Sequence, residues 1–293
     1  MRFIYDGMHY FSQFLRARNY ALYRRVVEFT LFQKIIQALS GEKHVEVLSP
    51  ENYRLCVNPI YHGHYLSSKK IVQYEPEIRA VMKSIVQPGM VVYDVGANAG
   101  VFSLCLASLV GDKGRVYAFE PEQNNLKCLI RTKEINALDH LEIFPVCAGE
   151  ESGVAYFDRR GGSFSGRLVD ETAPRHANVI SVKVVSLDDF VYKNQHEPPH
   201  LIKIDVEGQE RKVFKGMPRI LNEYTPIIIC ELHRSLDPRV ADLFDVLQDK
   251  GYESYDIHDW AEGGQPALRD FNRTHHFISF LKKPETAKHR ENS

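Results

Sequence analysis

The sequence has no surplus of charge of either sign, because 37 Lys and Arg residues stand against 38 Asp and Glu residues. A protein that binds nucleic acid usually carries a basic excess, so we expect no nucleic-acid partner. The longest mainly apolar run, residues 101–110, is well short of the roughly 18 residues of a membrane-spanning helix. The first residues also lack the pattern of a signal peptide. We therefore expect neither a transmembrane segment nor secretion.

Cysteine is scarce and does not form an even set: the chain has five cysteines at irregular spacing, most of them inside apolar runs. Such a pattern favours reduced, buried thiols over a disulfide framework. Reduced thiols are typical of the cytoplasm, which is the location we expect. With 293 residues, the chain is long enough for one large domain and an extension.

One stretch joins a strand pattern directly to a helix pattern. The apolar run 91–95 contains Asp94 and leads into Gly96-Ala97-Asn98-Ala99-Gly100, after which residues 101–106 resume with helical periodicity. This order predicts a strand, a tight turn and a helix. A second strand pattern, residues 116–119, ends in Glu120-Pro121. Because parallel strands end at the same edge of a sheet, both acidic residues are expected at one ligand-binding edge.

The spacing of the glycines favours one class of nucleotide over another. A dinucleotide site needs the order G-x-G-x-x-G, but Asn98 occupies the middle glycine position and Asp94 would repel a phosphate. S-adenosylmethionine fits better, because it has a cationic group and a ribose diol that Glu120 could bind. The alternatives are an NAD-dependent oxidoreductase and a non-catalytic nucleotide-binding scaffold of the same fold. Nine cofactor-binding residues are predicted: Asp94, Gly96, Ala97, Asn98, Gly100, Glu120, Pro121, and Cys147 and Ala148 beside the adenine.

Two later strand patterns also end in polar residues. The run Leu201-Ile202-Lys203-Ile204 leads into Asp205, Glu207 and Gly208, and the run 226–230 leads into Glu231 and His233. Transfer of a methyl group to a hydroxyl needs a general base, and His233 or Asp205 is the predicted base, with Glu207 or Glu231 orienting the base or the acceptor. A second scheme, which we favour less, places Mg²⁺ on Asp205, Glu207 and Glu231. The alternative for Glu207 and Glu210 is a structural role at a helix start.

Several other segments carry open predictions. Residues 1–40 are rich in aromatic and basic residues at helical spacing, so they predict amphipathic helices that pack on the domain or on a second subunit, contact an anionic membrane, or cap the substrate site. The arginine- and glycine-containing stretch 159–167 predicts either a mobile lid or a solvated loop. Trp260 lies in a predicted loop, where it would stack on a sugar or pack. His62 and His64 have no third ligand nearby in the sequence, which argues against a metal there.

Taken together, Tyr93–Gly100, Phe119-Glu120-Pro121, Ile202–Glu210 and Glu231-Leu232-His233 resemble the FkbM family of S-adenosylmethionine-dependent methyltransferases, over roughly residues 70–283. The resemblance implies an α/β class I methyltransferase (Rossmann-like) fold, with a seven-stranded, mostly parallel sheet whose last strand, residues 276–281, is reversed. It also implies methylation of a hydroxyl on a sugar, glycolipid or polyketide-type acceptor. The expected division is a helical extension at 1–44, the methyltransferase domain at 45–283 and a polar tail at 284–293.

Overall fold

The computed structural model describes residues 44–58, 62, 74–158, 167–169, 178–233, 237–261 and 276–281. The predicted helices of residues 1–40, His64, most of the 159–167 loop and the tail lie outside the described residues. Within the described part, no helix is long and apolar enough to cross a bilayer.

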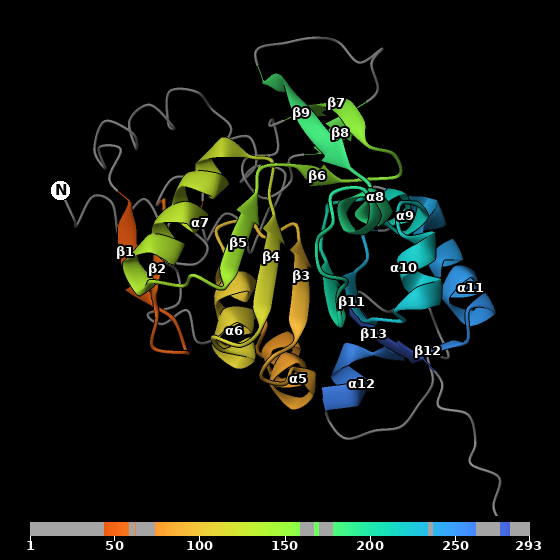
Figure 1. Ribbon diagram of the computed structural model, residues 1–293, viewed down its shortest axis with the longest axis horizontal. Coiled ribbons are helices and arrows are strands. Elements are labelled where there is room, and N and C mark those ends of the chain that lie inside the picture. Colours follow the sequence, from red (N-terminus) through yellow and green to blue (C-terminus); the bar gives the residue numbers. More distant parts are fainter. Residues whose placement is uncertain are drawn as a thin grey trace, which may run out of the picture.

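A seven-stranded sheet forms the centre of the fold (Figure 1). Its strands are, in spatial order, β12 (Tyr252–Asp256), β13 (His276–Leu281), β11 (Ile227–Glu231), β10 (Leu201–Ile204), β3 (Val91–Val95), β4 (Arg115–Phe119) and β5 (Leu141–Phe144). The strands β3, β4, β5, β10 and β11 pair in parallel, whereas β13 runs antiparallel to both β11 and β12. The predicted sheet with a reversed last strand is confirmed.

Alternation along the inner strands buries both faces of this sheet. In β4, Val116 and Ala118 join one core cluster, while Tyr117 and Phe119 join the other. The first face is covered by α5 (Pro76–Ile85), α6 (Val101–Val110), α7 (Gln123–Asn136) and α12 (Ile257–Ala261). The second face is covered by α8 (Leu187–Tyr192), α9 (Glu210–Lys215), α10 (Pro218–Glu223) and α11 (Asp242–Asp249), which follows the 3-10 turn η2 (Pro238–Ala241). Strands covered on both faces read as continuous apolar runs, as these do.

Two smaller sheets flank the centre. A hairpin of β1 (Val45–Leu48) and β2 (Arg54–Val57) packs on α7. A four-stranded sheet of β6 (Cys147–Ala148), β9 (Val179–Val185), β7 (Gly153–Asp158) and β8 (Arg167–Val169) lies beyond the carboxyl ends of β3, β4 and β5 (Figure 1). The long insertion after β5 therefore builds a wall at the edge of the sheet where the ligand site was expected.

Two local predictions differ from the structure. The apolar run 141–146 predicts one strand of six residues, but β5 ends at Phe144, where the chain leaves the central sheet, and the next strand begins at Cys147 and pairs with β9 in the smaller sheet. Residues 257–261 form α12 where a loop was expected. Trp260 packs there against Tyr255 and Phe280, with ring centroids 5.4 and 4.8 Å away, so packing accounts for this side chain.

Candidate active site

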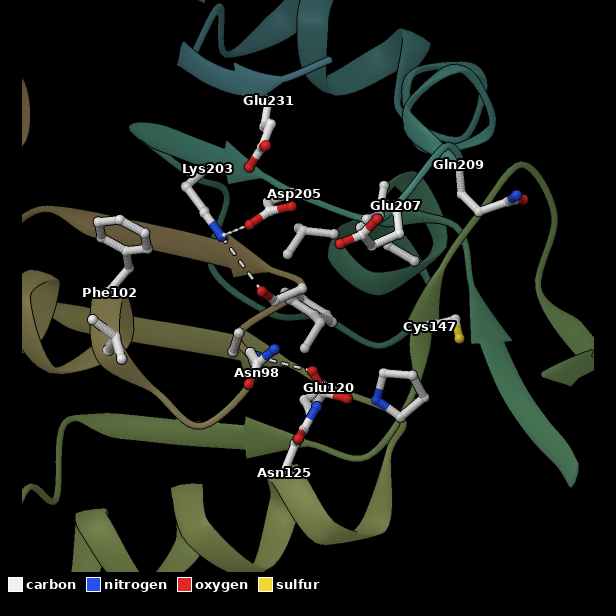
Figure 2. A pocket seen from close by; sticks show the side chains of 18 of the residues that line it. Asn98, Phe102, Glu120, Asn125, Cys147, Lys203, Asp205, Glu207, Gln209 and Glu231 are labelled. Atoms are coloured by element: carbon white, nitrogen blue, oxygen red, sulfur yellow. Dashed lines mark hydrogen bonds and ion pairs between the residues drawn. The ribbon is translucent and has the colours of Figure 1, made fainter. Parts of the chain in front are cut away.

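A pocket opens at the carboxyl ends of β3, β4, β10 and β11 (Figure 2). The turn after β3, Glu120 and Pro121 after β4, and Asp205, Val206 and Glu207 after β10 all line it. The smaller sheet contributes Cys147, Ala148 and Phe157. The structure thus brings seven of the nine predicted cofactor-binding residues to one cavity: Gly96, Ala97, Asn98, Glu120, Pro121, Cys147 and Ala148.

Asp94 and Gly100 do not line the pocket. The Asp94 side chain is wholly buried, where Oδ2 accepts a hydrogen bond from Ser103 Oγ at 2.6 Å and Oδ1 lies 3.6 Å from Lys203 Nζ. Gly100 begins α6 with φ of +92°, and a Cβ there would lie 2.4 Å from Leu129 Cδ1. Both residues lie behind the turn and not on the surface of the pocket, and their contact with a ligand stays a prediction. The spacing of residues in the sequence does not distinguish those that line the pocket from those buried directly behind it.

Gly96 is where the two loops of the pocket meet. Its φ is +84°, and a Cβ at this position would lie 1.8 Å from the backbone oxygen of Asp205. The β3 and β10 loops can therefore approach this closely only if residue 96 is a glycine.

We expect Gly96→Ala to destabilise the protein by more than about 2 kcal/mol, since it adds a steric clash to the cost of a left-handed backbone. Gly89→Ala is a matched control, because Gly89 has φ of +88° but open space around the added Cβ. This control should cost only about 1–2 kcal/mol. Urea unfolding of both variants measures the difference, and equal losses would mean that the loops do not need this contact.

Glu120 forms one end of the pocket. Its Oε2 accepts a hydrogen bond from Asn98 N at 2.8 Å and its Oε1 accepts one from Glu122 N at 2.7 Å. Burial raises the pKa of Glu120 to about 7, against the opposing effect of these two amide donors. The carboxyl group is therefore held in one orientation beside the turn that follows β3, as Figure 2 shows.

An acidic cluster forms the other end. Glu75, Asp205, Glu207 and Glu231 all line the pocket with Lys203. Figure 2 shows Lys203 beside Asp205, with Glu207 and Glu231 nearby. Lys203 is buried, and its Nζ lies 3.2 Å from Asp205 Oδ2 and 3.4 Å from Gly96 O. Burial lowers the pKa of Lys203, but Asp205 and Asp94 outweigh this effect and raise it. The ammonium group therefore stays charged and holds the β3 and β10 loops together.

The members of the acidic cluster differ in their protonation. Burial raises the pKa of Glu207 to about 7, and burial together with Glu231 and Asp205 raises that of Glu75 to about 7. Glu231 behaves in the opposite way: burial opposes ionisation, but His276 and His233 lower its pKa to about 2. Burial also raises the pKa of Asp205, although Lys203 opposes this effect. Near neutral pH, Glu207 thus exchanges protons while Glu231 stays ionised.

His233 is held behind the acidic residues and does not line the pocket. Its Nδ1 lies 2.6 Å from Oε1 of the fully buried Glu210, and its Nε2 lies 3.4 Å from Glu207 Oε2 and 3.6 Å from Glu231 Oε1. Burial alone would lower the pKa of His233, but Glu210, Glu207, Asp205 and Glu231 raise it to about 9. An imidazole with this pKa already carries its second proton at pH 7, which argues against the predicted base role.

His233 should also make stability depend on pH. A folded-state pKa near 9 against about 6.5 when unfolded gives a contribution that is complete below pH 6.5 and is lost as the pH rises through 9. The free energy of unfolding should fall by up to about 3 kcal/mol over this interval. His233→Gln should flatten the decline, whereas His200→Gln, outside the acidic cluster, should not. Denaturant unfolding at pH 6, 7.5 and 9 tests this, and an unchanged decline in His233→Gln would count against it.

Several residues that line the pocket were not predicted from the sequence, chiefly Lys203, Glu75, Tyr74, Phe102, Asn125 and Gln209. The sequence does give an indication for Lys203. A charged residue in the middle of a strand that is buried on both faces is costly unless it is paired, so its presence in an apolar run indicates a partner of opposite charge. The sequence gives no such indication for Glu75, which reaches the pocket from the loop before α5, far from the recognised motifs. Glu75 and Glu207 both adopt positive φ, 44° and 50°, which is uncommon for non-glycine residues and frequent at functional sites.

Of the residues in the predicted Mg²⁺ scheme, the structure brings Asp205 and Glu231 together with His233 rather than with Glu207. The ligand atoms of these three residues lie within 4.8 Å of one another. Lys203 and protonated His233 offset part of the acidic charge here.

Two known methyltransferases are similar to this chain in sequence. The hexuronic acid methyltransferase AglP of Haloferax volcanii is 29% identical over 158 residues, which are 51% of this chain and 58% of that protein. The 31-O-demethyl-FK506 methyltransferase FkbM of Streptomyces tacrolimicus is 29% identical over 202 residues, or 57% of this chain and 74% of that protein. The chain thus spans little more than half the length of the first of these relatives.

Among solved structures, the methyltransferase FkbM from Methylobacillus flagellatus KT superposes with a TM-score of 0.44 at 22% identity, covering 66% of this chain and 43% of that one. The model of the methyltransferase FkbM domain matches residues 94–254, which begin at Asp94 and end within β12. This match takes in the pocket turn, Glu120, the β10 loop and Glu231, and it covers more than half of the 293 residues. The chain therefore belongs to the FkbM methyltransferase domain family.

Proposed function

We propose that this protein is an S-adenosylmethionine-dependent O-methyltransferase. The observation that carries the proposal is a single pocket with Glu120 fixed at one end and the Glu75, Asp205, Glu207 and Glu231 carboxyls at the other. A carboxylate beside a glycine turn suits the two ribose hydroxyls of a nucleoside. The acidic end suits the sulfonium and ammonium groups of the methyl donor and would repel a pyrophosphate.

The acceptor we propose is a hydroxyl of a sugar, glycolipid or polyketide-type molecule. The names of two relatives support parts of this class: one is a hexuronic acid methyltransferase, which points to a sugar, and the other is a 31-O-demethyl-FK506 methyltransferase, which points to methylation at oxygen. Neither name fixes the acceptor here, because the matched regions cover only part of each chain. An uncharged acceptor is the better fit to the acidic end of the pocket.

The bond-forming step is an in-line displacement. The acceptor oxygen forms a bond to the methyl carbon while the carbon–sulfur bond breaks, and the sulfur keeps the electron pair. Bringing the reactants into line is the main contribution of such a site. The acceptor hydroxyl must also give up its proton, and we assign this proton to a carboxylate of Glu207.

Glu207 suits the role of base better than the two residues that the sequence favoured. It lines the pocket and its pKa of about 7 lies near the working pH, where a general base is most effective. Asp205 is held by Lys203, and His233 is protonated. In this proposal His233 lies 3.4 Å behind Glu207 and holds its carboxylate in place.

Calorimetry with S-adenosylhomocysteine and with NAD tests the donor. We expect micromolar-range binding of the first and none of the second at equal concentration. Incubation with methyl-labelled donor and a panel of neutral glycosides, uronic acids and polyketide alcohols then tests the acceptor. Binding of NAD alone would support the oxidoreductase alternative, and donor binding without label transfer to any member of the panel would support the scaffold alternative.

A further inference from the structure

A second group of metal-ligand side chains lies apart from the pocket, where the β1–β2 hairpin packs on α7 (Figure 1). His44 precedes β1, Cys56 is on β2 and Cys128 is on α7. Their ligand atoms all lie within 4.8 Å of one another, and none of the three residues lines the pocket. Residues far apart in the sequence thus converge on one point of this interface.

The surroundings of the two thiols are ordered and partly polar. Both cysteines are completely buried and neither is in a disulfide. The backbone N of Cys56 donates to Thr132 Oγ1 at 2.9 Å, and Cys128 Sγ lies 3.7 Å from His62 Nδ1. That imidazole nitrogen accepts a hydrogen bond from Asn58 N at 3.0 Å, so His62 supports the group without being needed as a ligand.

The three side chains are of the kinds that bind a soft divalent ion. Thiolate and imidazole together select Zn²⁺ among the common metals, with Zn–S near 2.3 Å and Zn–N near 2.0–2.1 Å. Ligand atoms around such an ion are about 3.5 Å apart. Side-chain rotations that move the ligand atoms by about 1 Å would therefore bring the three residues to this separation. Both cysteines bind a metal as thiolates, so each must lose its thiol proton.

We propose that His44, Cys56 and Cys128 form a zinc-binding site. Binding releases the remaining thiol protons to solvent, and the exposed position of His44 leaves the fourth coordination place open to water. The ion would fasten the hairpin to α7, the helix whose first turn contributes Asn125 to the pocket. This proposal does not depend on the methyltransferase assignment.

Cobalt substitution tests the site in the full-length protein. With Co²⁺ added to reduced, chelator-treated protein, we expect one equivalent to bind, with a near-ultraviolet band from thiolate-to-cobalt charge transfer. Zinc should displace it one for one. Cys56→Ser and Cys128→Ser should abolish the charge-transfer band, and His44→Ala should weaken cobalt binding about tenfold or more.

The chain offers matched controls for these variants. Cys105→Ser removes a buried free cysteine on α6 that is outside the group, and it should leave the spectrum and the stoichiometry unchanged. His44→Ala keeps both thiols, and because His44 is exposed the variant should fold as the parent does. Cobalt bound without a thiolate band, or with a band that survives Cys56→Ser, would overturn the proposal. So would a Cys56–Cys128 disulfide as the only product found by mass spectrometry of untreated protein.

Discussion

Replacement of Glu207 by Gln is expected to lower kcat for methyl transfer by about 10²- to 10⁴-fold, the usual contribution of a general base. Glutamine keeps the size of the side chain but cannot take a proton from the acceptor. The KM for S-adenosylmethionine should rise far less than kcat falls, because Asp205 and Glu231 remain at the acidic end of the pocket. Steady-state kinetics with labelled donor measures both constants, once an acceptor has been identified by the panel experiment.

The pH profile separates this role from a structural one. The rate of the parent enzyme should rise with pH through about 7, the pKa to which burial raises Glu207, and then level off. Glu207→Gln should lose this dependence. Glu134→Gln, on the exposed side of α7, is the control and should match the parent. A Glu207→Gln variant with parental kcat and the same pH profile would remove Glu207 from the mechanism.

Glu120→Gln should weaken S-adenosylhomocysteine binding by about 10- to 100-fold, as expected when hydrogen bonds to a charged group are lost. Only one side-chain oxygen remains to accept from Asn98 N or Glu122 N, so the turn also loses an anchor. Calorimetry gives the affinity. Thermal unfolding of the ligand-free variant shows how much of the loss comes from the fold.

Glu122→Gln is the matched control for this change. Glu122 is a neighbouring buried carboxylate that caps α7, accepting from Asn124 N at 2.6 Å and Asn125 N at 3.0 Å, and it does not line the pocket. Its replacement should cost about 1 kcal/mol of stability and leave the affinity nearly unchanged. If both variants lost affinity equally, the contact of Glu120 with the nucleoside would be refuted.

The sequence predicted most of the sheet because its strands are apolar on both faces and end in recognisable turns. The pattern around Asp94 placed Gly96, Asn98 and Glu120 at one edge, and the structure puts all three in the pocket. It did not reveal that Asp94 faces inward to Ser103, since alternation along a strand says which face a side chain takes but not how deeply the turn buries it. The early end of β5 at Phe144 likewise goes with the pairing of the following strand, β6, with β9, which comes more than 30 residues later.

The protonation states of the residues in the site were the property that the sequence predicted least well. An isolated histidine titrates near pH 6.5, which made His233 the natural base. Glu210, Glu207, Asp205 and Glu231 surround it only after folding, and together they raise its pKa to about 9. Burial raises the pKa of Glu207 to about 7, and for this reason our proposal assigns the base role to Glu207 and a positioning role to His233.

By itself, the order of apolar runs, glycines and acidic residues determined the succession of strands and helices and the edge of the sheet at which the site lies, because these follow from local periodicity and from the direction of parallel strands. The family followed from the resemblance of its motifs. Only the tertiary structure decided which acid faces the cavity, which histidine is protonated and which cysteines meet. Those properties arise from burial and from contacts between residues distant in sequence, and local patterns carry no information about either.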